Sequence, residues 1–147
     1  MEELQGIMKR LLANTFVMYM KAHGYHWNVT GSDFPQLHDF FGDLYEEIHS
    51  AIDDTAEQLR TIRSFAPGTL SRLLELSTIP EDENIPRPET MAQHLVDANE
   101  LVMNNLREAY AKAEEVSELG LSNFLQDRLT VHAKHGWMLR SIAGRAP

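Results

Sequence analysis

The sequence predicts an all-α protein, and three observations support that prediction. Apolar residues recur every three or four positions along four long stretches, which is the period of an amphipathic helix. No stretch shows the strict polar–apolar alternation of a half-buried strand. The six prolines and eight glycines gather at a few turns between the stretches. Four long amphipathic helices joined in this way form a four-helix bundle.

The first two helices are expected from about Glu3 to Asn28 and from Phe34 to Phe65. Both segments carry a continuous apolar face, and the face of the second is almost unbroken. Ser32 or Asp33 can cap the second helix, because Pro35 follows in its first turn, where proline is tolerated. The short turn between the segments makes the two helices antiparallel neighbours.

The second half of the chain contains two more long helices and a short one. Residues Thr69–Leu76 are expected to form the short helix, and Ser77–Pro88 an acidic connector broken by prolines. Together they are long enough to cross the length of the bundle. The third long helix is expected over Glu89–Val116, with Gly120 as its stop, and the fourth from Ser122 to about Ile142.

Length and composition narrow the class of protein. A chain of 147 residues is expected to form one domain, residues 1–147, with a real core. The absence of cysteine excludes a disulfide scaffold, a thiolate zinc site and a cysteine nucleophile. The net charge of −9 makes nucleic acid a poor partner and favours cations. Because there is neither a signal peptide nor a membrane-spanning stretch, we expect a soluble, cytoplasmic protein.

Two histidines and two acids form a candidate metal site. His26 lies near the end of the first helix and His38 one turn into the second, so both imidazoles can reach the same end of the bundle. Asp53 and Glu57 are four residues apart and therefore share one face of the second helix. Each residue alone is more often a packed histidine or a solvated acid. The four together favour a site for iron or a similar divalent ion.

The spacing of these residues predicts that one chain cannot close the site. Positions 38 and 53 differ by 15 residues, which is about 22 Å along a helix at about 1.5 Å per residue. Two second helices paired antiparallel about a two-fold axis near Tyr45–Glu47 would bring His38 of one chain to Asp53 and Glu57 of the other. A symmetric dimer of this kind holds two identical sites.

Several residues give this pattern a specific resemblance. It resembles the Dps family of mini-ferritins, and the match covers nearly the whole chain, including the short helix before the third long one. The residues that carry the resemblance are His26-Trp27-Asn28, Gly31, Phe34, Leu37-His38, Phe41, Asp53, Ala56-Glu57 and Trp137-Met138-Leu139-Arg140.

The resemblance implies a ferritin-like bundle and a ferroxidase centre made of His26 and His38 from one subunit and Asp53 and Glu57 from its two-fold mate. It also implies a hollow homo-dodecamer, built from two-fold dimers, that oxidises Fe(II) with hydrogen peroxide or oxygen and stores the ferric mineral. Zinc or manganese could compete for the same ligands. No other cofactor is expected.

The chain departs from the family pattern in two places. The family usually has an acid one turn after the second histidine, where this chain has Gly42. We expect the second metal position, with His26 as its nearest ligand, to be weaker for that reason. We also explain this glycine by a close approach of two second helices at the dyad. DNA-binding members often carry a lysine-rich tail, and this chain ends in Gly144-Arg145-Ala146-Pro147. Direct DNA binding is therefore not expected.

Some residues near the site have two interpretations. His49 lies near the predicted dyad and is read as an interface histidine, with a substitute metal ligand as the alternative. Trp27 either sits close to the metals or packs at a subunit contact. Asp127 and Glu118 are candidates for a three-fold pore that admits Fe(II), with a solvated acidic surface as the alternative.

The other histidines are assigned to structure. His132 continues an apolar stripe and is expected to be a satisfied core residue. His23 is off the inward phase of its helix and is expected to be exposed. His94 has only Asp97 as a partner at helical spacing.

Two other functions remain open at this point. One is a nucleoid-compacting, DNA-protecting cage with weak or altered ferroxidase activity. The other is a structural helical bundle in which the histidines and acids carry no metal chemistry.

Overall fold

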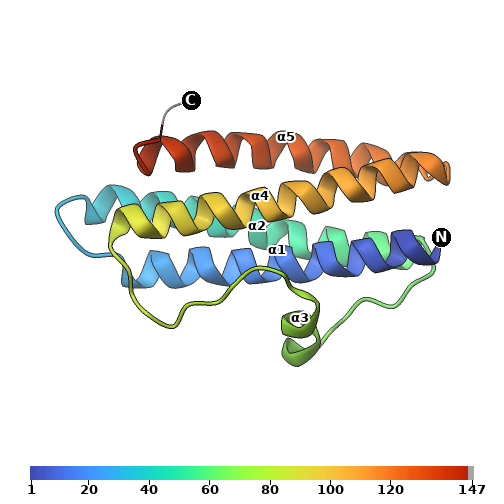
Figure 1. Cartoon of the computed structure of the whole chain (residues 1–147), viewed down its shortest axis with the longest axis horizontal. Helices are drawn as coiled ribbons and strands as arrows, with labels where there is room; N and C mark the ends of the chain where they lie inside the picture. Colours follow the sequence, from blue (N-terminus) through green and yellow to red (C-terminus); the bar gives the residue numbers. More distant parts are fainter. Residues whose placement is uncertain (146–147) are drawn as a thin grey trace.

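The computed structural model describes residues 1–145 as a bundle of helices with no strand in that range. The helices are α1 (Glu2–Asn28), α2 (Phe34–Thr61), α3 (Leu70–Leu76), α4 (Pro88–Glu115) and α5 (Leu119–Ile142). The four long helices lie side by side along one axis, and α3 lies outside them (Figure 1). This arrangement confirms the all-α prediction. Within the described range, none of the helices is both long and apolar enough to cross a membrane.

The connection between α2 and α4 sets the topology. A short turn joins α1 to α2, so these helices are antiparallel, and another short turn joins α4 to α5 (Figure 1). Between the two pairs, the chain passes through α3 and returns along the length of the bundle (Figure 1). As a result α2 and α4 run in the same direction, as the length of the predicted connector required.

The core is built from the inward stripes of the four long helices. Burying each large apolar side chain contributes roughly 1.5–3 kcal/mol, which offsets the entropy lost on ordering the chain. The largest fully buried side chains are Phe41, Leu4, Met8, Leu11, Met18, Ile48, Leu59, Met91, Leu95, Leu106, Leu125 and Leu139. Most of them lie on the stripes predicted from periodicity.

Two helix ends differ from the prediction. Helix α2 ends at Thr61 and not at Phe65, because Arg63 adopts a left-handed φ of 62° and the Ser64 N–H bonds back to the Leu59 carbonyl at 3.0 Å. This is the usual closure of a helix C-terminus, but glycine normally occupies the left-handed position. With arginine there, the sequence carries no visible stop signal.

The end of α4 repeats this motif, so Gly120 does not stop that helix. Ser117 takes the left-handed φ of 61°, and the Glu118 N–H bonds to the Ala113 carbonyl at 2.9 Å. Gly120 instead lies in the first turn of α5, which begins at Leu119 and not at Ser122. The prediction was wrong because it assigned the turn to the nearest glycine.

One buried asparagine holds the connector to the bundle. The Asn14 side-chain oxygen accepts hydrogen bonds from the Thr78 N–H at 2.8 Å and the Ser77 hydroxyl at 2.9 Å. Its amide nitrogen donates to the Thr78 hydroxyl at 3.0 Å and to the Asn105 side-chain oxygen. Asn14 is fully buried, so these bonds are needed to offset its desolvation. Periodicity marks Asn14 only as a polar residue in an apolar region.

Candidate metal centre

His26 and His38 meet beside the turn that joins α1 to α2, and each ring bonds to the other residue's backbone. The His26 Nδ1 donates to the His38 carbonyl at 2.6 Å, and the His38 Nδ1 donates to the His26 carbonyl at 2.8 Å. A carbonyl can only accept, so both rings carry their hydrogen on Nδ1 when neutral. Each Nε2 is then left with a free lone pair, which is the form that binds a metal ion.

The two imidazoles are also fixed by stacking. Their ring centroids are 3.8 Å apart with an interplanar angle of 17°, and Phe34 stacks on His38 at 5.0 Å. Both histidines are only partly buried. The sequence predicted that these residues share one end of the bundle, and the structure brings them together.

Gly42 lies beneath His26 and makes room for its ring. A Cβ at this buried position would lie 3.1 Å from both Cε1 and Nδ1 of His26. The glycine is therefore explained by the packing of α1 on α2 within one chain. The expected explanation, a close approach of two second helices at the dyad, is not needed.

The predicted acids form a cluster farther along α2. Oxygens of Asp53, Asp54 and Glu57 all lie within 4.8 Å of one another, and the three residues are exposed in the single chain. Asp54 was missed by the sequence analysis, although it adjoins Asp53. Three exposed carboxylates this close repel one another unless a cation or a basic partner sits among them.

One chain holds two separate half-sites. The acid cluster begins 15 residues after His38 on the same continuous helix, which is about 22 Å along the axis. The structure therefore places His26 beside His38 and Asp53 beside Glu57, and it keeps the imidazoles and the carboxylates apart. Each half presents unused ligand atoms at the surface of the chain.

A second group of histidines lies between α2, α4 and α5, where the ring atoms are already in use. His132 is 1% exposed, its Nδ1 donates to the Asn99 side-chain oxygen at 2.9 Å, and its Nε2 accepts from Arg128 at 2.9 Å. Arg128 also binds Glu47 through two bonds of 2.7 and 3.0 Å, and Glu47 accepts from His135 at 2.7 Å. The prediction that His132 is a satisfied core residue is confirmed.

This network shifts two pKa values downward. Burial, reinforced by the Arg128 charge, lowers the pKa of His132 to about 3. Burial alone would raise the pKa of Glu47, but hydrogen bonds from His135 and Arg128 outweigh it and lower that pKa to about 2. At neutral pH the site is thus a neutral imidazole beside an ionised Arg–Glu pair, which suits a structural role.

His23 is partly buried, so the expectation that it is exposed was wrong. Its Nδ1 bonds with the Tyr19 hydroxyl at 2.9 Å, and its ring stacks on Tyr45 at 3.8 Å and approaches Trp27 at 4.0 Å. Burial lowers the pKa of His23, with the nearby His26 as the next cause. The aromatic partner comes from α2, which helical phase within α1 does not reveal.

His94 has a partner that its helix does not supply. Its Nδ1 bonds with the Tyr25 hydroxyl of α1 at 2.9 Å. Burial, followed by the charge of Asp82, raises the pKa of Tyr25 to about 12, so the phenol stays protonated. Asp97 accepts from Gln93 instead, at 2.8 Å.

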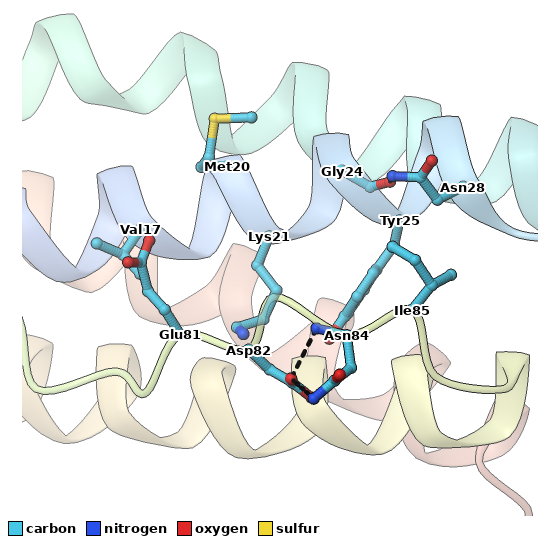
Figure 2. Close-up of a pocket in the computed structure, with 10 residues that line it drawn as sticks. All are labelled: Val17, Met20, Lys21, Gly24, Tyr25, Asn28, Glu81, Asp82, Asn84 and Ile85. Carbon is cyan, nitrogen blue, oxygen red and sulfur yellow. Dashed lines mark hydrogen bonds between the residues drawn. The ribbon is translucent and has the colours of Figure 1, made fainter.

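A cavity of about 220 Å³ lies between α1 and the connector. Figure 2 shows Lys21 and Tyr25 projecting from α1 toward Asp82 and Asn84 of the connector. Asp82 already accepts two bonds from Asn84, at 2.9 Å from the backbone and 2.8 Å from the side chain. Burial lowers the pKa of Lys21, and the charges of Asp82 and Glu81 oppose that shift. The hydrogen bonds between Asp82 and Asn84 lie within the connector itself.

Comparisons with known proteins agree with this geometry. The model of the ferritin-like domain family matches residues 6–147. The chain is 34% identical to general stress protein 20U of Bacillus subtilis over 97% of this chain and 99% of that protein. It is 30% identical to DNA protection during starvation protein 2 of Bacillus anthracis, covering 92% of this chain and 93% of that protein. The chain belongs to the Dps family of ferritin-like proteins.

Solved structures support the same assignment of this Dps-family chain. The Dps protein from Vibrio cholerae, described as a ferritin-like diiron-carboxylate protein, superposes with a TM-score of 0.91 at 30% identity. The superposition covers 95% of this chain and 88% of that one. The ferritin-like fold and the short helix in the long connection are therefore as predicted.

The remaining predicted residues of this Dps-family chain lie at its surface. Trp27 is 56% exposed, next to the half-site of His26. Asp127 is exposed on α5, and Glu118 lies at the N-cap of that helix.

Proposed function

We propose that this protein oxidises Fe(II) at a centre shared by two subunits and stores the ferric product in a cage of identical chains. The observation that carries the proposal is the pair of half-sites on one helix. His26 and His38 each use Nδ1 in a hydrogen bond, which leaves Nε2 free to bind a metal ion, and about 22 Å further along α2 Asp53 and Glu57 are exposed. Iron is the substrate and the cargo of this centre.

Two-fold pairing of α2 would complete the centre. When two copies of α2 lie antiparallel, His38 of one meets Asp53 and Glu57 of the other, and symmetry repeats the site at the far end. Two imidazoles and two carboxylates form a ligand set that suits Fe(II), and Zn²⁺ or Mn²⁺ would compete for it. A closed assembly of such dimers, a dodecamer in our proposal, would enclose the mineral, with Asp127 and Glu118 as candidate residues of the iron entry pore.

Hydrogen peroxide is the proposed oxidant. Two Fe(II) ions each give one electron, and one H₂O₂ with two protons becomes two waters, so the reaction is balanced without releasing a hydroxyl radical. Oxygen is the alternative oxidant. The enzymatic class is therefore a ferroxidase, an oxidoreductase that acts on metal ions.

The test combines the mass of the assembly with iron oxidation. Anaerobic Fe(II) titration followed by peroxide, read by ultraviolet absorbance, should show rapid oxidation in an assembly much heavier than one 16.8 kDa chain. The double variant Asp53→Ala/Glu57→Ala should oxidise iron at least about 10-fold more slowly, because even the loss of a residue that only supports a metal ligand costs about 10–100-fold. Asp97→Ala/Glu100→Ala, which removes two exposed acids of α4, is the matched control. A monomer at micromolar concentration, or an unchanged rate in the first variant, contradicts the proposal.

Direct DNA protection is the second candidate, since relatives carry that name. The net charge of −9 opposes binding to phosphate. We expect no retention of DNA in a gel-shift experiment at physiological salt without magnesium or free iron. Protection would then come from the removal of Fe(II) and peroxide. Tight binding under these conditions would favour the DNA-compacting function instead.

A further inference from the structure

The position one turn after His38 has no ligand of its own. Gly42 is buried under His26, whose ring fills the space that a side chain would need. An acid cannot be placed here without moving the His26 imidazole, which its hydrogen bond to the His38 carbonyl and its stacking on the His38 ring hold in position. Position 42 therefore cannot supply a further ligand at this end of the centre, and another chain can.

His49 lies on the same stripe of α2 as the acid pair. It precedes Asp53 by four residues, and Asp53 precedes Glu57 by four, so the three side chains follow one another turn by turn along the helix. His49 is exposed, and within residues 1–145 it makes no hydrogen bond through its side chain. Its ring rests near Tyr19, with 4.9 Å between ring centroids.

The register that pairs His38 with Asp53 of a second copy also pairs Gly42 with His49 of that copy. Gly42 lies four residues after His38, and His49 lies four residues before Asp53. In an antiparallel pair, moving four residues toward the two-fold axis on one helix corresponds to moving four residues toward that axis on the other helix. Gly42 of one chain therefore faces His49 of the other.

The same chain's His49 cannot take this place. His26 lies against Gly42 and Tyr19 lies near His49, so the two contacts are seven residues apart on each helix, or roughly 10 Å. Of the two copies of His49, only that of the second copy can reach Gly42.

We propose that His49 of the partner subunit is a metal ligand at this centre and takes the role that an acid after His38 would otherwise have. The inference rests on the proposed function, because it uses the same two-fold pairing. It replaces the expectation that Gly42 leaves the second metal position weak. Three histidines and two acids then surround the two metal positions, with one negative charge fewer than in a site that has a third acid.

The change of ligand from carboxylate to imidazole has a chemical consequence. Imidazole suits Zn²⁺ and Fe(II), whereas harder ions prefer carboxylate oxygen. We therefore expect the second position to bind Zn²⁺ readily and to be sensitive to the loss of one imidazole.

The test counts Zn²⁺ ions by calorimetry on the assembled protein, with the mass of the assembly measured on the same samples. The unmodified protein should bind two ions per centre. His49→Ala should bind one and should lose at least about 10-fold in affinity at the second position, the range expected for a damaged metal shell. His49→Asp supplies a carboxylate in place of the imidazole and should restore the second ion. Ser50→Ala is the matched control, since the exposed Ser50 hydroxyl donates only to the Glu47 backbone carbonyl of its own helix, at 2.6 Å.

Each result decides the question. Two ions per centre in intact assemblies of His49→Ala would overturn the inference and leave the proposed function standing. If His49→Ala breaks the assembly, His49→Phe decides, because it keeps a ring beside Tyr19 but has no ligand atom: one ion per centre supports a ligand, and two ions in an intact assembly overturn the inference. No ion bound by the unmodified protein would overturn this inference together with the proposed ferroxidase centre.

Discussion

Two pairs of histidines in this protein look alike in composition and differ in what their ring atoms do. His26 and His38 each use Nδ1 on a backbone carbonyl and leave Nε2 free at the surface. His132 and His135 are joined to Asn99, Arg128 and Glu47 inside the bundle, and both nitrogens of His132 are occupied. The first pair is held in position with one nitrogen of each ring free, whereas in the second pair both nitrogens of His132 and the Nε2 of His135 already have hydrogen-bond partners.

The comparison shows that the fold leaves ring nitrogens of one histidine pair free to bind a metal ion and occupies both ring nitrogens of His132. A buried histidine with both nitrogens bonded gains nothing from a metal ion, because binding would break hydrogen bonds that offset its desolvation. A histidine fixed through Nδ1 alone has a defined tautomer and a free lone pair. Substitutions in the two pairs should therefore affect different properties.

The largest expected effect is the loss of iron oxidation when His26 or His38 is replaced. His26→Ala and His38→Ala should each lower the initial oxidation rate by about 10–100-fold while far-ultraviolet circular dichroism stays helical. The stripes that form the core do not depend on these residues. The rate is measured with peroxide and Fe(II) in anaerobic buffer. A wild-type rate in both variants would remove the histidines from the centre.

The next effect is a loss of stability when His132, from the second histidine pair, is replaced. His132→Ala should lower the free energy of unfolding by about 2–4 kcal/mol, because it leaves a cavity and removes a hydrogen-bond partner from both Asn99 and Arg128. Denaturant unfolding measures this change. The folded variant should still oxidise iron at the normal rate. A loss of iron oxidation in His132→Ala with unchanged stability would contradict the structural role assigned to His132.

The lowered pKa values of His132 and Glu47 should also make the stability of the protein sensitive to acid. His132 has a pKa of about 3 in the fold against an ordinary value of 6.5, and Glu47 a pKa of about 2 against 4.5. The unfolded chain therefore binds more protons than the folded chain between pH 6.5 and 2, so stability falls as the pH is lowered through that range. In thermal melts, Glu47→Gln should be less stable than the unmodified protein at pH 7. It should also lose less stability between pH 5 and pH 3, and an unchanged acid slope would contradict this assignment.

The smallest expected effect distinguishes two buried glycines. Gly42→Ala would press on His26 at 3.1 Å, whereas Gly136→Ala would press on the Asn99 amide at 3.0 Å and the Arg140 guanidinium at 2.9 Å. Alanine in place of a helical glycine gains about 1 kcal/mol of helix propensity. Gly42→Ala should therefore keep its melting temperature and lose several-fold in metal affinity. Gly136→Ala should lower the melting temperature and keep its metal affinity. The opposite pattern would show that the packing at Gly42 does not affect the metal centre.

Much of the fold follows from local pattern. The stripe that includes Leu4, Met8, Leu11 and Met18 repeats with the helical period, and such a stripe has to be buried against other helices. The two helix ends at Arg63 and Ser117 were not predictable in this way, because non-glycine residues occupy the left-handed position there. Their conformation depends on the hydrogen bonds that close each helix end.

The candidate site divides along the same line. Spacing alone determined that His38 and Asp53 lie far apart on one helix, since the helical rise sets their separation, and it predicts that a centre made of both would need a second chain. Only the tertiary structure decided which atoms are free. The carbonyls that hold His26 and His38, the ring that fills the space over Gly42, and the bonds that occupy His132 come from segments far apart in sequence. Such contacts depend on how helices pack against one another, and the period of a single helix carries no information about its neighbour.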